Sequence, residues 1–168
     1  MVTEYHERIQ RIILDLGKDL MENGNTVKKV RQGSSRPIHI NHPTKDKNIL
    51  YKPDAYYERK DGRIIAFEVL DSQSCEKTIA DVTRSILNPN VRHLCLITKD
   101  DRSRNEVVKT CDVVLSSIAD SADVPKEELL QSVSVVKVTV TKSKKRKEVE
   151  KLLSIALTDL SPSIMRKK

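Results

Sequence analysis

Apolar residues recur in this chain with a helical period near its two ends and in strand-like runs between them. Residues 3–22 carry apolar side chains at three- and four-residue spacing, which predicts a helix with one apolar face. Residues 26–31 are interpreted as a short edge strand. Residues 36–48 hold two prolines and show no clear period, so they are predicted to form a loop with a short extended piece at Ile38-His39-Ile40.

Residues 51–73 are predicted to form a β-hairpin. Asp61-Gly62 is a strong turn signal between two strand patterns. Asp54 follows a proline near the start of the first strand, and Glu68 lies within the apolar run of the second. A carboxylate inside an apolar strand is costly unless something binds it. The hairpin therefore carries one acid on each strand, of which Glu68 needs an explanation.

The second half of the chain alternates helical and strand patterns. We expect a helix at 75–87 to bury an apolar face made by Ile79, Val82, Ile86 and Leu87. Ser103 and Glu106 have the spacing of a capping box and are predicted to start the next helix. The remaining predicted elements are a buried strand at 91–98, a helical turn at 127–131, a strand at 134–141 and a helix at 143–160.

This order predicts an α/β domain with a mixed central sheet flanked by helices. The hairpin supplies antiparallel strand pairs, and the later strand–helix–strand steps supply parallel ones. We assign residues 1–160 to a single domain and residues 161–168 to a flexible basic tail.

The composition indicates the cellular compartment in which the protein is expected. No run of 18 apolar residues occurs, which predicts no membrane span. The first ten residues lack the layout of a signal peptide. The three cysteines are scattered and form no CxxC pair, which argues against a disulfide framework or a zinc cluster. We therefore expect an intracellular, cytoplasmic protein.

The formal net charge of +7 indicates a polyanionic partner, of which nucleic acid is the first candidate. Aromatic residues make up only 3% of the chain, so base stacking on aromatic side chains is not expected to dominate. Contacts to phosphates suit duplex or branched DNA. The predicted DNA-binding residues are Lys142, Lys144, Lys145, Arg146 and Lys147. The alternative is an inert basic surface with a solvated helix start.

The two hairpin acids suggest a metal site. Neighbouring strands lie about 4.8 Å apart, so the carboxylates of Asp54 and Glu68 could converge on one Mg²⁺ or Mn²⁺ ion. Such an ion would polarise a phosphoryl oxygen and lower the pKa of a water molecule. The alternative is that Asp54 is a turn residue and Glu68 faces solvent on an edge strand. His39 and His42 form an HxxH pair, but a loop supplies no further ligands, so a metal site there is not favoured.

Pro53-Asp54, the hairpin and Glu68-Val69-Leu70 together resemble the PD-(D/E)xK nuclease superfamily. The resemblance covers about the first hundred residues. It implies a restriction-endonuclease-like core of helix, three antiparallel strands, helix and strand. The leading helix and the turn Gly33-Ser34-Ser35 are loosely similar to the archaeal Holliday-junction resolvase branch, which implies a homodimer that the sequence itself does not show.

The resemblance also implies roles for individual residues. Asp54 and Glu68 match the two metal ligands, and the backbone carbonyl of Val69 would be a third. The lysine of the motif is replaced by Leu70, which can neither position water nor stabilise a charged transition state. Two substitutes lie nearby, Lys77 at the start of the next helix and Gln73 before it. The acid that the family carries on its first helix would be Glu7, whose angular position predicts a solvated side chain instead.

The sequence thus predicts a Mg²⁺- or Mn²⁺-dependent endonuclease acting on duplex or branched DNA. Leu70 supports an alternative, a catalytically inactive nuclease fold that binds DNA or a protein.

Overall fold

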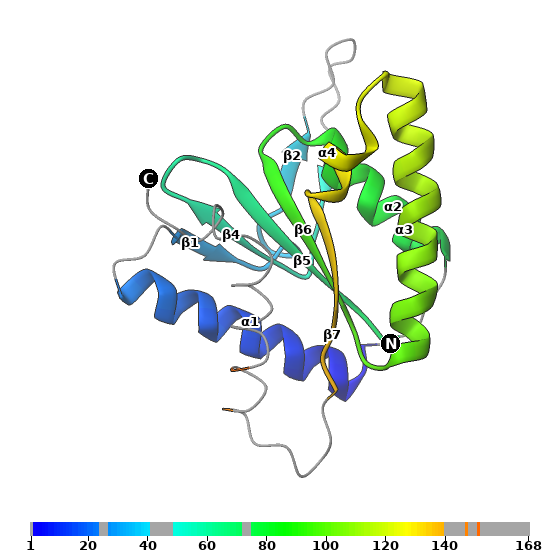
Figure 1. Cartoon of the computed structure of the whole chain (residues 1–168). Helices are drawn as coiled ribbons and strands as arrows, with labels where there is room; N and C mark the ends of the chain where they lie inside the picture. Colours follow the sequence, from blue (N-terminus) through cyan, green and yellow to red (C-terminus); the bar gives the residue numbers. More distant parts are fainter. Residues whose placement is uncertain are drawn as a thin grey trace.

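A mixed five-stranded sheet forms the centre of the protein, in the strand order β1-β4-β5-β6-β7 (Figure 1). The computed structural model describes residues 2–23, 27–40, 49–71 and 75–139, together with Lys147 and Lys151. The strands of this sheet are β1 (Val27–Arg31), β4 (Ala55–Arg59), β5 (Ile64–Leu70), β6 (Val91–Thr98) and β7 (Val133–Lys137). β1, β4 and β5 pair antiparallel, whereas β6 and β7 continue parallel to β5. The predicted mixed sheet is confirmed.

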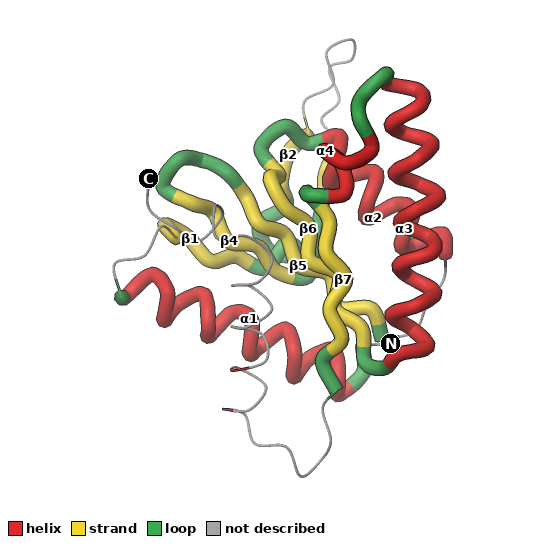
Figure 2. The backbone as a smooth tube through the Cα atoms, in the orientation of Figure 1, coloured by secondary structure: helices red, strands yellow, loops and turns green. Residues whose placement is uncertain are grey.

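Helices cover both faces of this sheet (Figure 2). The helices are α1 (Glu4–Glu22), α2 (Cys75–Leu87), α3 (Asp101–Ala122) and the short α4 (Lys126–Leu130). The apolar face of α1 packs on one side, where Ile9 and Ile13 meet Phe67 of β5. α2 and α3 pack on the other side, where Val82 and Leu115 meet Leu96 of β6. Among the described helices, none combines the length and apolar character that a membrane span requires.

Two short strands precede the hairpin and form a second, two-stranded sheet. These are β2 (Ile38–Ile40) and β3 (Ile49–Tyr51), paired antiparallel with Ile38 opposite Tyr51. Five strands therefore come before α2, where the sequence predicted three. The extended piece at 38–40 is confirmed, but β3 was not predicted because three residues are too few to show a strand period. Its last residue, Tyr51, is fully buried.

The start of α3 differs from the prediction. The helix begins at Asp101, and Asp100 is its N-cap, with a side chain that accepts the backbone N–H of Ser103 at 2.7 Å. The predicted capping box of Ser103 with Glu106 is therefore wrong, because an earlier acidic residue in extended conformation already satisfies that N–H group. Glu106 instead forms an ion pair with Arg102.

α1 approaches the sheet most closely at Gly17. A Cβ atom there would lie 2.5 Å from Cε1 of Tyr57 and 2.7 Å from Cγ2 of Val30. We predict that Gly17→Ala lowers the free energy of unfolding by roughly 1–3 kcal/mol, because overpacking outweighs the higher helix propensity of alanine. Urea unfolding measures this, with exposed Lys18→Ala as the control. A variant more stable than wild type would contradict the close approach.

Candidate active site

The β4–β5 hairpin brings Asp54, the residue before β4, beside Glu68 of β5, as the sequence predicted. Gly62 occupies the turn with a φ of 80°, and Ala55 pairs with Phe67 across the ladder. Asp54 precedes Ala55 and Glu68 follows Phe67, so the two acids lie opposite each other in the same register. Oδ2 of Asp54 accepts the backbone N–H of Val69 at 2.7 Å. The first acid is thus tied directly to the strand that carries the second.

Two side chains of α1 hold Asp54 from the other direction. Nε2 of His6 lies 3.1 Å from Oδ1 of Asp54. Nε2 of Gln10 donates to the backbone carbonyl of Asp54 at 2.7 Å. His6 and Gln10 were not predicted as site residues, because no local pattern links α1 to the start of β4. Asp54 is therefore an oriented carboxylate and not a freely rotating turn acid.

Glu68 lies in the middle of a fully buried central strand. Glu68 is 3% exposed, and its side chain lies on the same sheet face as those of Ala66 and Leu70. Burial raises the pKa of Glu68 well above its ordinary value, and the neighbouring Asp81 and Asp54 carboxylates raise it further. The alternative in which Glu68 faces solvent on an edge strand is wrong.

A third acid, Asp81 of α2, is buried on the side of that helix that packs against the sheet. It is 5% exposed, and its Oδ2 atom has no hydrogen-bond partner. Burial raises the pKa of Asp81 to about 6, with Lys77 acting in the opposite direction and Asp54 in the same direction. The spacing of Thr78, Asp81 and Ser85, which puts them on one helix face, is the sequence feature that identifies Asp81 as a candidate.

Tyr51 of β3 adds a neutral oxygen. Its hydroxyl is buried and lies beside Glu68, where it lowers the pKa of that carboxyl without reaching ordinary hydrogen-bond geometry. This residue was also missed, because β3 itself was not predicted.

Leu70 occupies the position of the motif lysine, and Lys77 and Gln73 are its predicted substitutes. Leu70 is 2% exposed and packs in the apolar cluster with Val82, so it presents no polar group to the acids. Lys77 is exposed on the first turn of α2, and its positive charge lowers the pKa of both Glu68 and Asp81. Gln73 lies outside the described residues.

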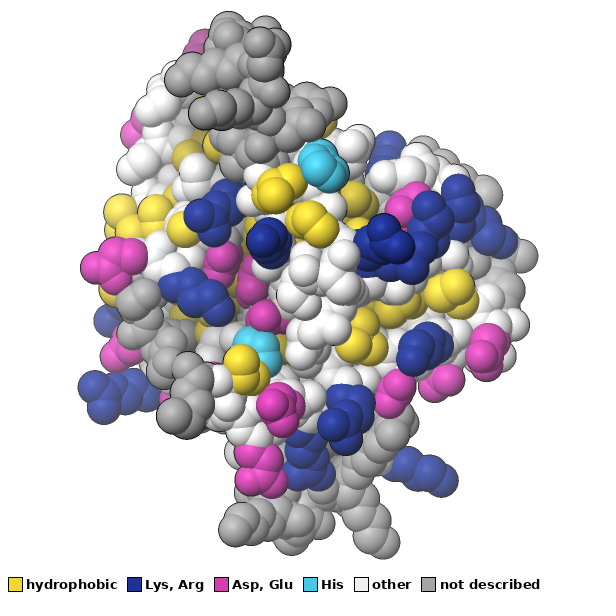
Figure 3. All heavy atoms as spheres, turned by 180° about the vertical axis from the view of Figure 1, so that it is seen from behind, with side chains coloured by type: hydrophobic (Ala, Val, Ile, Leu, Met, Phe, Trp, Pro, Cys, Tyr) yellow, Lys and Arg dark blue, Asp and Glu magenta, His cyan; other side chains and the backbone are white. Residues whose placement is uncertain are grey.

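The other predicted residues are exposed or lie outside the described part. Glu7 is exposed, as its angular position predicted. Lys147 is exposed, and the remaining predicted DNA-binding residues, Lys142, Lys144, Lys145 and Arg146, lie outside the described residues, as does the tail 161–168. In Figure 3, basic side chains are spread over one face of the molecule and interleave with acidic and apolar ones.

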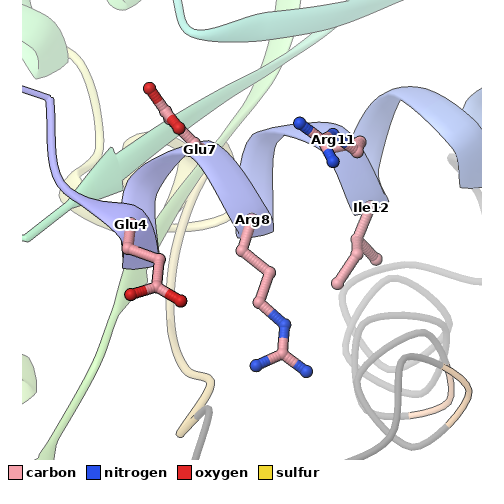
Figure 4. Close-up of a pocket in the computed structure, with 5 residues that line it drawn as sticks. All are labelled: Glu4, Glu7, Arg8, Arg11 and Ile12. Atoms are coloured by element: carbon pink, nitrogen blue, oxygen red, sulfur yellow. The ribbon is translucent and has the colours of Figure 1, made fainter. Parts of the chain in front are cut away.

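A separate hollow of about 320 Å³ follows α1 (Figure 4). It is lined by Glu4, Glu7, Arg8, Arg11 and Ile12. Because a helix turns about 100° per residue, Glu4, Arg8 and Ile12 lie on the side of α1 away from His6 and Gln10. This hollow is therefore not part of the acidic site.

The chemistry of the acidic site fits a divalent cation. Carboxylate and hydroxyl oxygens are the ligands that Mg²⁺ and Mn²⁺ prefer, and the unpartnered oxygens of Asp81 and Tyr51 are free to take part. In the described ranges, no group of three His, Cys, Asp or Glu side chains is arranged to hold a metal ion. Mg²⁺ does not need one, because it is usually held by one or two carboxylates and keeps several waters. The carbonyl of Val69 as a ligand stays a prediction.

Comparison of the chain with protein-family models, with curated proteins and with solved structures finds no match.

Proposed function

We propose that this protein is a divalent-metal-dependent nuclease that hydrolyses phosphodiester bonds in duplex or branched DNA. The observation that carries the proposal is the burial of Glu68 on a central strand beside Asp54, with Asp81 close enough to raise its pKa. Three carboxyl groups that disfavour one another's ionisation are costly to keep together. A bound divalent cation would offset that cost.

Asp54 and Glu68, with the carbonyl of Val69, are the proposed metal-holding groups. When bound, Mg²⁺ or Mn²⁺ would supply Lewis-acid polarisation of a phosphoryl oxygen and a lowered pKa of water. The contribution of the protein is to orient the Asp54 carboxylate. His6 and the Val69 N–H group each hold one oxygen of Asp54, so its lone pairs have a defined direction.

Lys77 is the proposed substitute for the lysine that Leu70 replaces. Its charge lowers the pKa of Glu68 and Asp81, and the same charge would stabilise negative charge that develops on phosphate. We predict that Lys77→Met lowers the cleavage rate about a hundredfold. Single-turnover cleavage measures the rate, and Lys109→Met on α3 is the matched control. If Lys77→Met cleaves DNA as fast as wild type, Lys77 does not substitute for the motif lysine, and Gln73 is the remaining candidate.

Binding to DNA is expected to rest on phosphate contacts. The net charge of +7 and the spread of basic side chains support this expectation. The predicted DNA-binding residues, Lys142, Lys144, Lys145, Arg146 and Lys147, would add further phosphate contacts. The affinity for DNA should fall steeply with salt concentration. The homodimer implied by the resolvase resemblance stays a prediction, which analytical ultracentrifugation tests.

The direct test is a nicking assay on supercoiled plasmid and on a four-way DNA junction with Mg²⁺, Mn²⁺ or EDTA. We expect cleavage with either metal, none with EDTA and at least about a hundredfold less with Asp54→Asn. This variant also controls for contaminating nucleases, since it is purified in the same way. Cleavage equal in wild type and Asp54→Asn, or absent from both with either metal, would overturn the proposal.

Buried Leu70 favours a second candidate, a nuclease-type fold that binds DNA without cutting it. That protein would bind DNA in a salt-dependent manner, would cut neither substrate, and would be unaffected by Asp54→Ala.

A further inference from the structure

α2 turns a partly polar face toward the sheet, contrary to its amphipathic pattern. The buried residues of this helix are Thr78, Asp81, Val82 and Ser85. Two residues of the predicted apolar face, Ile79 and Leu87, are 42% and 60% exposed. A rotation of the helix that exchanged Asp81 for Ile79 would bury more apolar surface and expose a carboxylate to water. A local arrangement that lowers the stability of the fold commonly marks a functional position.

The buried carboxyl of Asp81 has no protein partner for one of its oxygens. Oδ2 makes no hydrogen bond, although a buried polar atom without a partner costs on the order of 1–3 kcal/mol. Asp81 precedes Val82, which packs in one cluster with Ala66 and Leu70, and Glu68 lies between these two residues on the same face of β5. The α2 face that buries Asp81 therefore covers the sheet face that carries Glu68.

Tyr51 provides an independent observation from a different element. It is 1% exposed, and its hydroxyl is buried beside Glu68 without a hydrogen-bond partner. Two buried oxygens without partners, one from α2 and one from β3, thus accompany the carboxyl of Glu68. Such oxygens suit a hard cation with its water molecules better than they suit an apolar core.

We infer that Asp81 is a third acidic residue of the cation site, joining Asp54 and Glu68 from α2, with the Tyr51 hydroxyl as a further oxygen there. The inference rests on the proposed function, because it adds residues to the same site. It also balances the charge, since three carboxylates are matched by one divalent cation and the ammonium group of Lys77. Mutual repulsion disfavours close approach of the three ionised carboxyls. A cation bound between them would make their close approach favourable.

Mn²⁺ binding tests the inference without relying on catalysis. Free Mn²⁺ is measured by electron paramagnetic resonance during titration of the purified full chain. We expect Asp81→Asn to weaken Mn²⁺ binding by about tenfold or more, and Tyr51→Phe to weaken it by a smaller factor. Asp120→Asn is the matched control, because it removes one negative charge from the exposed side of α3, and it should stay within about twofold of wild type.

Thermal unfolding gives a second readout. Asp81→Asn should raise the melting temperature of the metal-free protein, because it removes a repelling buried carboxyl. It should also reduce the additional rise that Mn²⁺ produces. Asp81→Ser is measured in parallel, and it decides the question if the asparagine variant does not fold.

The outcomes separate the inference from the proposed function. If Asp81→Asn binds Mn²⁺ as Asp120→Asn does while Asp54→Asn binds weakly, Asp81 is not part of the site and the proposed function stands. If wild type binds no Mn²⁺ at millimolar concentration, both are overturned. If Mn²⁺ binding depends on Asp81 but DNA is not cut, the cation site stands and the nuclease proposal falls.

Discussion

Replacing Glu68 by glutamine is expected to abolish metal-dependent DNA cleavage and, at the same time, to stabilise the metal-free protein at pH 7. Glutamine keeps the size of the side chain but removes a charge that burial, Asp81 and Asp54 all disfavour. We expect cleavage to fall by about a thousandfold or more, since a proposed metal-holding group is lost. A residue that served only the fold would not give both effects.

The same substitution changes how stability depends on pH. The pKa values of Glu68 and Asp81 are raised in the folded state, that of Asp81 to about 6. The folded protein therefore keeps protons that the unfolded chain has already released. This contribution to stability is present at acid pH and is lost as the pH rises through the folded-state pKa values. Without metal, wild type should become less stable from about pH 4 to pH 6 and above, and Glu68→Gln should show a smaller decrease.

Urea unfolding in EDTA at several pH values measures this effect, and single-turnover cleavage with Mg²⁺ measures the loss of activity. Glu128→Gln on α4 is the control, because it removes an exposed carboxylate of the same type. If Glu68→Gln were less stable than wild type at pH 7, the carboxylate would be contributing favourable interactions, and the argument for a cation there would fail.

Gly33→Ala is the second substitution with a large expected effect. Gly33 is buried and donates its N–H to the carbonyl of Pro53 at 3.0 Å. A Cβ atom at Gly33 would overlap that carbonyl oxygen and lie 2.6 Å from the nitrogen of Pro53. Both obstacles are backbone atoms, so the strand leading into Asp54 would have to move. We expect a loss of about 3 kcal/mol in the free energy of unfolding.

Activity should fall more than stability explains, because the displaced segment carries Asp54. Cleavage is measured at a temperature where Gly33→Ala is still folded. Gly62→Ala is the matched control, since a Cβ atom there meets nothing within 4 Å and only the positive φ is strained, at a cost of about 1 kcal/mol. Equal stability of the two alanine variants would show that the Gly33 turn can adapt.

The sequence predicted most of the elements and one half of the site. Helical spacing, the Asp61-Gly62 turn and the apolar run at 91–98 are local signals, and each corresponds to an observed element. The pairing of Asp54 with Glu68 also followed locally, because a tight hairpin aligns its own strands.

The other half of the site depends on contacts between segments that are distant in sequence. α1 brings His6 and Gln10 to Asp54, β3 brings Tyr51 to Glu68, and α2 brings Asp81. The predicted apolar face of α2 is confirmed at Val82 and Ile86 and is wrong at Ile79 and Leu87, which are exposed. Packing of the whole helix buries Asp81 instead.

Local sequence alone therefore determined an α/β chain with two acids on a hairpin, because periodicity and turn chemistry act over a few residues. Only the tertiary structure decided that Glu68 is buried, that Leu70 is enclosed in the core and that Asp81 of α2 is buried as well. Burial and mutual electrostatic effects arise from the packing of separate elements, which short-range patterns do not encode.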